Sequence, residues 1–251
     1  MKEWQKEQEA LIEKINQTCR QPFLNKITGA PFINPLRAAA LMLSFPDKDR
    51  KNERVQKQMI AAFLIQLAMD THDLIPSVTE EMTQKNQLIV LAGDYFSGMY
   101  YRTLAEAGCI HWVGILADAV KKVNEAKTSL HRHQLGSEAA IFKAVQTIEG
   151  NIIGAVYTEN KKEEVVWRAV QQLLTADRLF REKKQPFIVF EALVQVIGTK
   201  QQADQAIEQQ LEKMRLNINE CLKIMDSYSA AVIQRELDRL FSMPLRLVEE
   251  G

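Results

Sequence analysis

The chain has 251 residues, of which 46% are hydrophobic and 25% are charged. This balance supports a sizeable buried core and excludes a disordered chain. Its 32 basic residues equal its 32 acidic residues in number, so no overall field gathers nucleic acid or an anionic membrane surface. We expect one domain over residues 1–251, because a single core can grow to about this size.

Seven prolines and ten glycines are few for a chain of this length, and no alternating apolar and polar run is flanked by hairpin turns. The sequence therefore predicts an all-α protein, a single bundle of about ten helices. In chain order, helices are predicted near residues 3–20, between Pro35 and Pro46, from near Lys51 to Asp73, near residues 86–107, 110–132, 137–156, 163–181 and 186–197, through a stripe from Ala203 to Met225, and near residues 227–241.

Two of these helices have opposite apolar patterns. From Val55 to Leu67, apolar residues recur at steps of three and four with charges on the other side, which predicts an amphipathic helix. The segment from Leu88 to Tyr101 is instead apolar nearly all round. Because such a helix has no polar face, we expect it in the middle of the bundle.

The cysteines and the N-terminus indicate the compartment. Cys19, Cys109 and Cys221 show no CxxC spacing, so we interpret them as reduced packing residues. The first residues are too charged for a signal peptide, and the apolar run that begins at Leu88 is soon interrupted by Asp94. We expect a soluble, cytoplasmic protein without a transmembrane segment.

Three aspartates are the first candidates for chemistry. Asp70 and Asp73 are three residues apart and share a helix face, and a buried helix carries Asp94. Together they could coordinate magnesium, which takes oxygen ligands and commonly bridges carboxylates to substrate phosphates. The alternative is a solvated helix end at which Asp and His bond to the backbone, and spacing alone favours that alternative.

The order of two motifs along the chain makes a site for chemistry more plausible than spacing alone does. The sequence Ala-Met-Asp-Thr-His-Asp at residues 68–73, followed by Leu-Ala-Gly-Asp-Tyr at residues 91–95, resembles the trans-prenyl diphosphate synthases. In that family one helix carries His-Asp-Asp-x-x-Asp and the next begins near Leu-Ala-Gly-Asp-Phe/Tyr. The residues of these two segments are most similar to those of the small, non-catalytic subunits, called component I, of heptaprenyl diphosphate synthases. The resemblance implies the isoprenoid synthase fold and makes Asp70, His72 and Asp73 remnants of the first motif, with Asp94 and Tyr95 in the second.

The departures from the family pattern fall on its metal site. Leu74 and Ser77 stand where the second and third aspartates are expected. The Arg-Arg pair that should follow is absent, since Lys85 is the only basic residue between Ser77 and Asn86. No second Asp-Asp-x-x-Asp occurs, and its expected neighbourhood, residues 187–197, is apolar apart from Glu191 and Gln195. We therefore assign no catalytic residue and no metal site to this chain, and Asp73 and Asp94 are the remaining candidates for metal ligands.

The aromatic residues of the second motif helix have two interpretations. By the resemblance, Phe96, Tyr100 and Tyr101, next to Tyr95, are possible lining for an isoprenoid tunnel. A core helix uses the same residues for packing, and we prefer the packing interpretation.

The resemblance implies a subunit of a heterodimeric heptaprenyl diphosphate synthase that is inactive alone. Component II, the partner, would carry both aspartate motifs and the Mg²⁺, and the complex would extend farnesyl diphosphate with isopentenyl diphosphate to heptaprenyl diphosphate, the side-chain precursor of menaquinone-7. Two alternatives stay open: a stand-alone metal-dependent diphosphate enzyme using Asp70, Asp73 and Asp94, and a helical scaffold protein. The first hypothesis predicts an exposed apolar patch, because obligate heteromers bury large hydrophobic areas.

Overall fold

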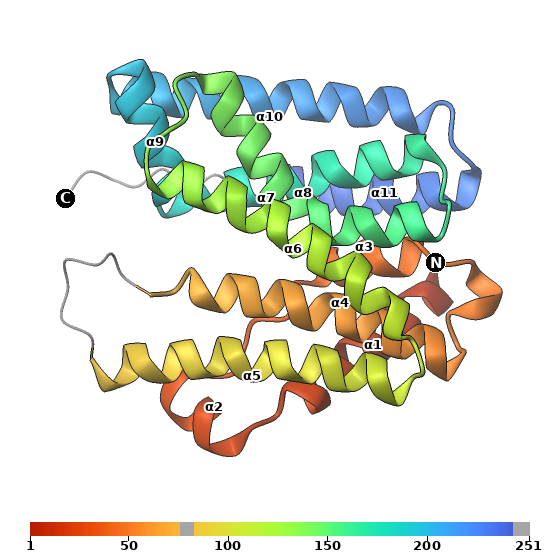
Figure 1. Cartoon of the computed structure of the whole chain (residues 1–251). Coiled ribbons are helices and arrows are strands. Elements are labelled where there is room, and N and C mark those ends of the chain that lie inside the picture. Colours follow the sequence, from red (N-terminus) through yellow and green to blue (C-terminus); the bar gives the residue numbers. More distant parts are fainter. Residues whose placement is uncertain (76–82, 243–251) are drawn as a thin grey trace. The chain divides into compact units, whose positions relative to one another are not determined.

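The computed structural model describes residues 1–75 and 83–242. Within these ranges the chain forms eleven α-helices and one 3₁₀-helix and contains no strand, which confirms the all-α prediction. The helices are α1 (Lys2–Cys19), α2 (Pro22–Thr28), α3 (Pro35–Leu43), the 3₁₀-helix η1 (Asp47–Asp49), α4 (Glu53–His72), α5 (Gln84–Glu106), α6 (Ile110–His131), α7 (Glu138–Glu159), α8 (Glu164–Lys184), α9 (Ile188–Ile197), α10 (Lys200–Leu222) and α11 (Ser227–Phe241) (Figure 1).

Backbone contacts divide the chain into two compact units, Met1–Asp118 and Ala119–Gly251, and α6 runs from one into the other. The single domain expected for the whole chain stays a prediction. Each of the ten predicted helices occurs, whereas α2 and η1 were not predicted. Both are too short to show an apolar period, and α2 depends on local signals, a Gln21 cap and Pro22 in its first turn.

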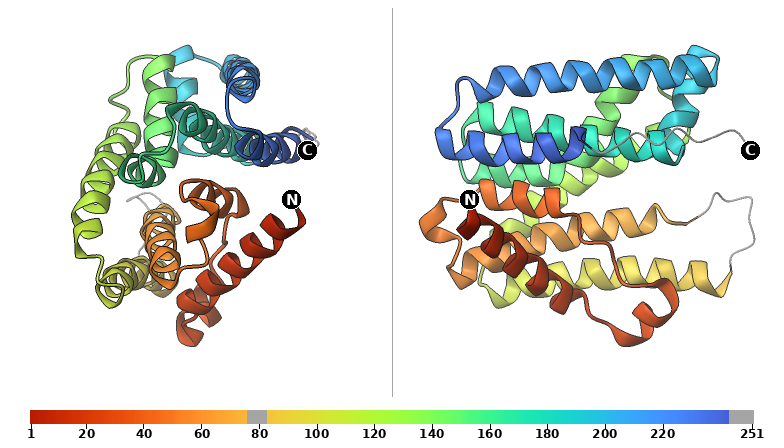
Figure 2. Two further views of the ribbon diagram at one scale, coloured as in Figure 1. Left: turned by 90° about the vertical axis from the view of Figure 1, so that its right-hand side faces the viewer. Right: turned by 180° about the vertical axis from the view of Figure 1, so that it is seen from behind.

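The centre of the first unit is α4, which packs along α5 and also contacts α1 and α3 (Figures 1 and 2). Charged residues gather in its first turn, and every side chain from Gln58 to Met69 is then buried. The predicted amphipathic helix is therefore buried nearly all round. Two of its buried polar residues donate hydrogen bonds: Gln58 donates to the Cys109 sulfur over 3.4 Å, and Gln66 donates to Asp70, whereas the Gln66 Oε1 has no hydrogen-bond partner among the described residues.

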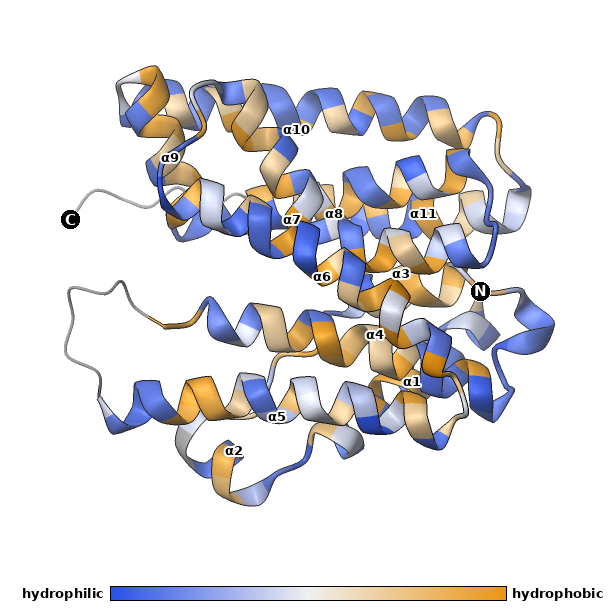
Figure 3. Ribbon diagram, viewed as in Figure 1, coloured by the Kyte–Doolittle hydropathy of each residue, from blue (hydrophilic) through white to orange (hydrophobic). Residues whose placement is uncertain are grey.

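The prediction that residues 88–101 lie in the middle of the bundle is wrong. In α5, Leu91 is 55% exposed and Tyr101 is 49% exposed, and Asp94 and Gly98 lie on the same open side. Figure 3 shows the apolar stretch in the N-terminal half of this helix. An all-round apolar pattern indicates contact on every side, but within this chain α5 has its main partner, α4, on one side only.

The second unit is organised around α8, which contacts α7, α9, α10 and α11 (Figure 2). Glu182 of α8 is 2% exposed, and its carboxylate accepts from the backbone N–H groups of Phe187 at 2.9 Å and Phe190 at 3.2 Å. These bonds cap α9, which has no side-chain cap of its own. Arg178 balances the buried acid, with its Nη2 2.8 Å from Glu182 Oε1.

The three cysteines, Cys19, Cys109 and Cys221, are free and buried, as predicted. Burial raises the pKa of the Cys19 thiol to about 12, so this group stays protonated at neutral pH. In residues 1–75 and 83–242, none of the helices combines the length and the apolar character that a membrane crossing requires.

Gly154 allows α7 and α8 to pack closely together. A Cβ atom at this position would lie 2.6 Å from Cζ2 of Trp167, an indole that also packs on Tyr157 with ring centroids 5.0 Å apart. We predict that Gly154→Ala lowers the free energy of unfolding by about 1–3 kcal/mol, because the overlap outweighs the better helix propensity of alanine. Urea denaturation measures this change.

The matched control is Gly114→Ala in α6, where nothing lies within 4 Å of the added carbon. Here only the propensity and the reduced freedom of the unfolded chain act, so stability should rise by up to about 1 kcal/mol. A Gly154→Ala protein as stable as the parent would show that α7 and α8 are not held at this distance.

Candidate functional site

The two sequence motifs meet where the end of α4 lies beside α5. The last residue of α4 is His72, whose ring lies so close to Gly93 that a Cβ there would be 2.5 Å from its Cε1. The missing side chain at Gly93 makes room for the imidazole. Asp94, which follows Gly93 in α5, lies with its Oδ1 3.8 Å from His72 Nε2. The structure thus brings together His72 of the first motif and Asp94 of the second.

Asp70 has a different set of partners. Its carboxylate forms an ion pair with Arg37 of α3, whose side chain is only 6% exposed, and accepts a hydrogen bond of 3.0 Å from Gln66. Sequence reasoning missed Arg37, although one cation in the otherwise apolar helix 35–43 was a signal of an acid opposite it. Asp70 therefore neutralises a buried guanidinium, and this is a structural role.

Asp73 follows the last turn of α4 as its C-cap residue. Its backbone is in the αR region, with φ −71° and ψ −13°, and its N–H donates to the carbonyls of Asp70 and Thr71. The helix-end interpretation of the sequence accounts for this backbone arrangement.

The described carboxylates at the motif positions do not gather around one point. Asp70 is paired with Arg37, Asp94 lies beside His72, and Leu74, 67% exposed, stands at the next position of the motif. Ser77, the last motif position, lies outside the described residues. Across the described residues, no three His, Cys, Asp or Glu side chains gather in a way that could hold a metal. The assignments of Asp73 and Asp94 as weak metal candidates stay predictions.

The predicted tunnel aromatics do not share one environment. Phe96 is 4% exposed and Tyr100 is 1% exposed, whereas Tyr101 is half exposed and Tyr95 is half buried. The Tyr100 hydroxyl donates to the carbonyl of Val113 over 3.4 Å. Burial, with a contribution from Tyr101, raises the pKa of Tyr100 well above its usual value, so the phenol stays neutral. Phe96 and Tyr100 act in packing here, and a tunnel remains a prediction.

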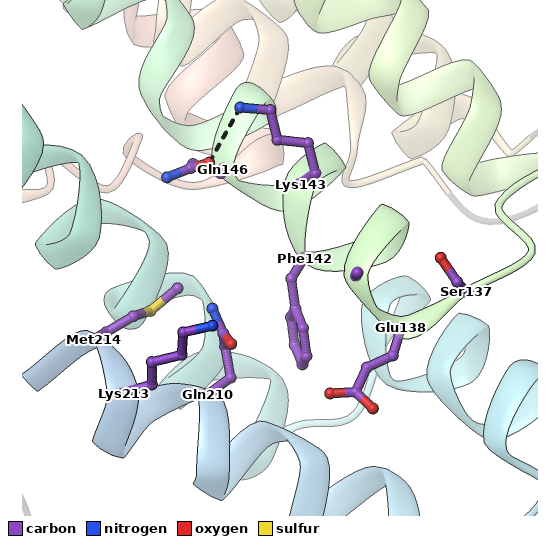
Figure 4. A pocket seen from close by; sticks show the side chains of 9 residues that line it. Ser137, Glu138, Phe142, Lys143, Gln146, Gln210, Lys213 and Met214 are labelled. Atoms are coloured by element: carbon purple, nitrogen blue, oxygen red, sulfur yellow. Dashed lines mark hydrogen bonds between the residues drawn. The ribbon is translucent and has the colours of Figure 1, made fainter. Parts of the chain in front are cut away.

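A groove lies elsewhere, between α7 and α10, and contains none of the predicted site residues (Figure 4). Lys143 and Lys213 line it from the two helices, with Glu138 as a carboxylate and Phe142 and Met214 as apolar side chains. Because the helices are far apart in sequence, no motif could have indicated it.

Single Asp→Asn substitutions distinguish an acid with a structural role from an acid at the surface. We predict that Asp70→Asn lowers the free energy of unfolding by about 1–3 kcal/mol, since a buried guanidinium loses its charged partner. Asp94→Asn removes a carboxylate that is 66% exposed and should change stability by less than about 0.5 kcal/mol. Thermal and urea unfolding of both variants measure the difference, and equal losses would contradict these roles.

Comparison with known proteins supports the motifs. The model of a family described as heptaprenyl diphosphate synthase subunit 1 matches residues 21–223. Heptaprenyl diphosphate synthase component 1 of Geobacillus stearothermophilus is 37% identical over 98 residues, which cover 39% of this chain and 44% of that protein. This alignment thus spans less than half of the relative.

Solved structures share the fold at low sequence identity. An isoprenoid synthase family member from Thermotoga neapolitana has a TM-score of 0.65 at 15% identity, covering 94% of this chain and 98% of that one. A polyprenyl synthase from Caulobacter crescentus has a TM-score of 0.61 at 16% identity, covering 94% and 95%. A decaprenyl diphosphate synthase from Rhodobacter capsulatus has a TM-score of 0.58 at 16% identity, covering 96% of each chain.

At these identities the likeness concerns the fold, and it confirms the predicted isoprenoid synthase architecture. The family model is more specific, because it covers most of the chain, including both motifs around His72 and Asp94. The protein belongs to the heptaprenyl diphosphate synthase subunit 1 family.

Proposed function

We propose that this chain is the non-catalytic subunit of a two-component heptaprenyl diphosphate synthase in the cytoplasm. Its partner is the catalytic component, component II, which carries both aspartate-rich motifs and binds Mg²⁺. The complex extends farnesyl diphosphate with isopentenyl diphosphate to heptaprenyl diphosphate, the side-chain precursor of menaquinone-7. Family membership and the prenyl synthase fold support the reaction class.

One observation carries the non-catalytic role: the acids at the motif positions are too few and serve other purposes. Departure of an allylic diphosphate requires neutralisation of its developing charge, which metal ions and Lys or Arg clamps supply at several kcal/mol each. Asp70 neutralises Arg37, and Leu74 replaces an aspartate of the family pattern. Asp73 and Asp94 alone provide too little negative charge to hold the metal ions.

The open side of α5 is the surface that we assign to the partner. Leu91 and Tyr101 are about half exposed, Gly98 between them has nothing within 4 Å of an added Cβ, and Asp94 is 66% exposed. A strip with two large exposed apolar residues and a small residue between them allows close approach of a second helix. Covering this side would also explain why the sequence of residues 88–101 is apolar nearly all round.

The chain then contributes by stabilising the partner and by shaping the volume in which the product grows. The buried packing of Phe96 and Tyr100 gives α5 a rigid inner side, and its outer side stays available for the partner. Chain length of the product would depend on both subunits under this proposal.

Prenyltransfer by the separate and mixed components tests the proposal. The chain alone, given farnesyl diphosphate, isopentenyl diphosphate and Mg²⁺, should form no product above background, and mixing with the catalytic component should yield heptaprenyl diphosphate. In the mixture, Asp73→Asn should change the rate by less than about three-fold. An Asp→Asn change in a motif of the partner should cost at least about a hundred-fold.

Turnover by the isolated chain would favour the stand-alone metal-dependent enzyme and contradict the proposal. Failure to form a complex or to raise prenyltransfer would leave the helical scaffold. An equal loss from Asp73→Asn and from the partner variant would assign this chain a catalytic carboxylate.

Substitutions on α5 test the proposed interface. We predict that Leu91→Glu or Tyr101→Glu raises the dissociation constant of the complex at least about ten-fold, because a charge would be buried against the partner. Ile224→Glu, at a residue that is 69% exposed in the second unit, is the control and should leave the constant unchanged. Isothermal titration measures all three, and full affinity of the α5 variants would place the interface elsewhere.

A further inference from the structure

A short segment between α1 and α3 holds two phenylalanines out of the protein. In residues 20–33, which we call the basic strap, Phe23 is 60% exposed and Phe32 is 74% exposed. Each is followed by a buried anchor, since Leu24 and Ile33 are both 8% exposed. The anchors secure the strap, and the aromatic rings remain in solvent.

The strap has a defined conformation at both ends. The side chain of Gln21 accepts from the Leu24 N–H at 2.9 Å and begins α2, and Gly29, with φ +84°, ends it through an N–H bond to Asn25. After Phe32, the Asn34 side chain accepts from the Leu36 N–H at 2.9 Å and begins α3. In addition, α2 packs on α5 (Figure 1). The exposure of the two rings is thus built into the local fold.

The charge of this region is one-sided, although the chain as a whole is neutral. No acidic residue occurs between Glu13 and Asp47. Within the strap, Arg20 and Lys26 are exposed cations, and Figure 3 shows apolar residues of α2 next to polar ones. The overall balance of charge, from which we expected no attraction to an anionic membrane surface, therefore does not describe this region.

We propose that the basic strap is a peripheral docking surface for an anionic lipid bilayer. Phe23 and Phe32 would enter the boundary between headgroups and acyl chains, where an aromatic ring leaves water without losing a hydrogen bond. Arg20 and Lys26 would lie at the level of the anionic headgroups. The other large exposed apolar residues, such as Leu74 and Ile224, do not form such a pair within a segment free of acids.

The strap differs from the open side of α5 that we assign to the catalytic partner. That side carries the carboxylate of Asp94, whereas the strap carries cations alone. The lipid inference goes beyond the proposed function and does not depend on it, because it concerns the affinity of this chain for a surface.

Vesicle co-sedimentation of the full chain tests the inference. The chain should bind vesicles of phosphatidylcholine and phosphatidylglycerol in equal amounts, with an affinity that falls as salt is raised, and should bind much less to phosphatidylcholine alone. The double variant Phe23→Ser/Phe32→Ser should lower the partition coefficient at least about ten-fold, since each ring loses its transfer from water. Arg20→Gln/Lys26→Gln should lower it at least about five-fold and flatten the salt dependence.

The matched control is Ile224→Ser, which removes an equally exposed apolar side chain outside the strap and should bind vesicles like the parent. Circular dichroism verifies that each variant is folded. Absence of binding to the anionic vesicles, or binding unaffected by the phenylalanine changes, would overturn the inference.

A protein contact at the strap gives a different result. In that case Phe23→Ser/Phe32→Ser would weaken the complex with the aspartate-rich catalytic component and leave vesicle binding as in the parent, which would also overturn the lipid assignment. Prenyltransfer by the mixed components in detergent, without vesicles, reports on the proposed function separately. Failure of one proposal is therefore distinguishable from failure of the other.

Discussion

The close packing of α4 on α5 is the constraint on which the first unit depends. It requires a residue without a side chain at position 93, because the ring of His72 occupies that space. The two motifs, which are separated in sequence, become neighbours only through this contact. The same contact buries α4 along most of its length and leaves the opposite side of α5 open.

Among the acids at the motif positions, Asp70 has a structural role in the described part of the chain. Asp70 remains because removing it would leave the guanidinium of Arg37 buried without its charged partner. In the second unit, Glu182 is buried for a similar reason, since it caps α9 and pairs with Arg178. Carboxylates committed to such bonds are poor ligands for a divalent cation. Asp70 and Glu182 therefore each balance the charge of an arginine side chain.

Charge balance has to be considered at the scale at which a partner acts. The equal numbers of acidic and basic residues describe the field at a distance, which is weak. At a surface, screening limits each interaction to about 8–10 Å, so a strap with cations and no acids has its own electrostatic character. The same reasoning separates the strap from the open side of α5, where Asp94 contributes a negative charge to a partly apolar strip.

The helical class, ten of the helices and the family could be predicted from the residues alone, because apolar periods, caps and motifs are local properties. The absence of a metal site, for which Leu74 and Ser77 are the sequence evidence, stays a prediction. The packing of the helices had to be seen to learn that α4 rather than α5 is the buried helix, that Arg37 pairs with Asp70, and that Phe23 and Phe32 are exposed. Periodicity shows which faces of a helix are apolar, whereas burial depends on which neighbours the rest of the chain places against those faces.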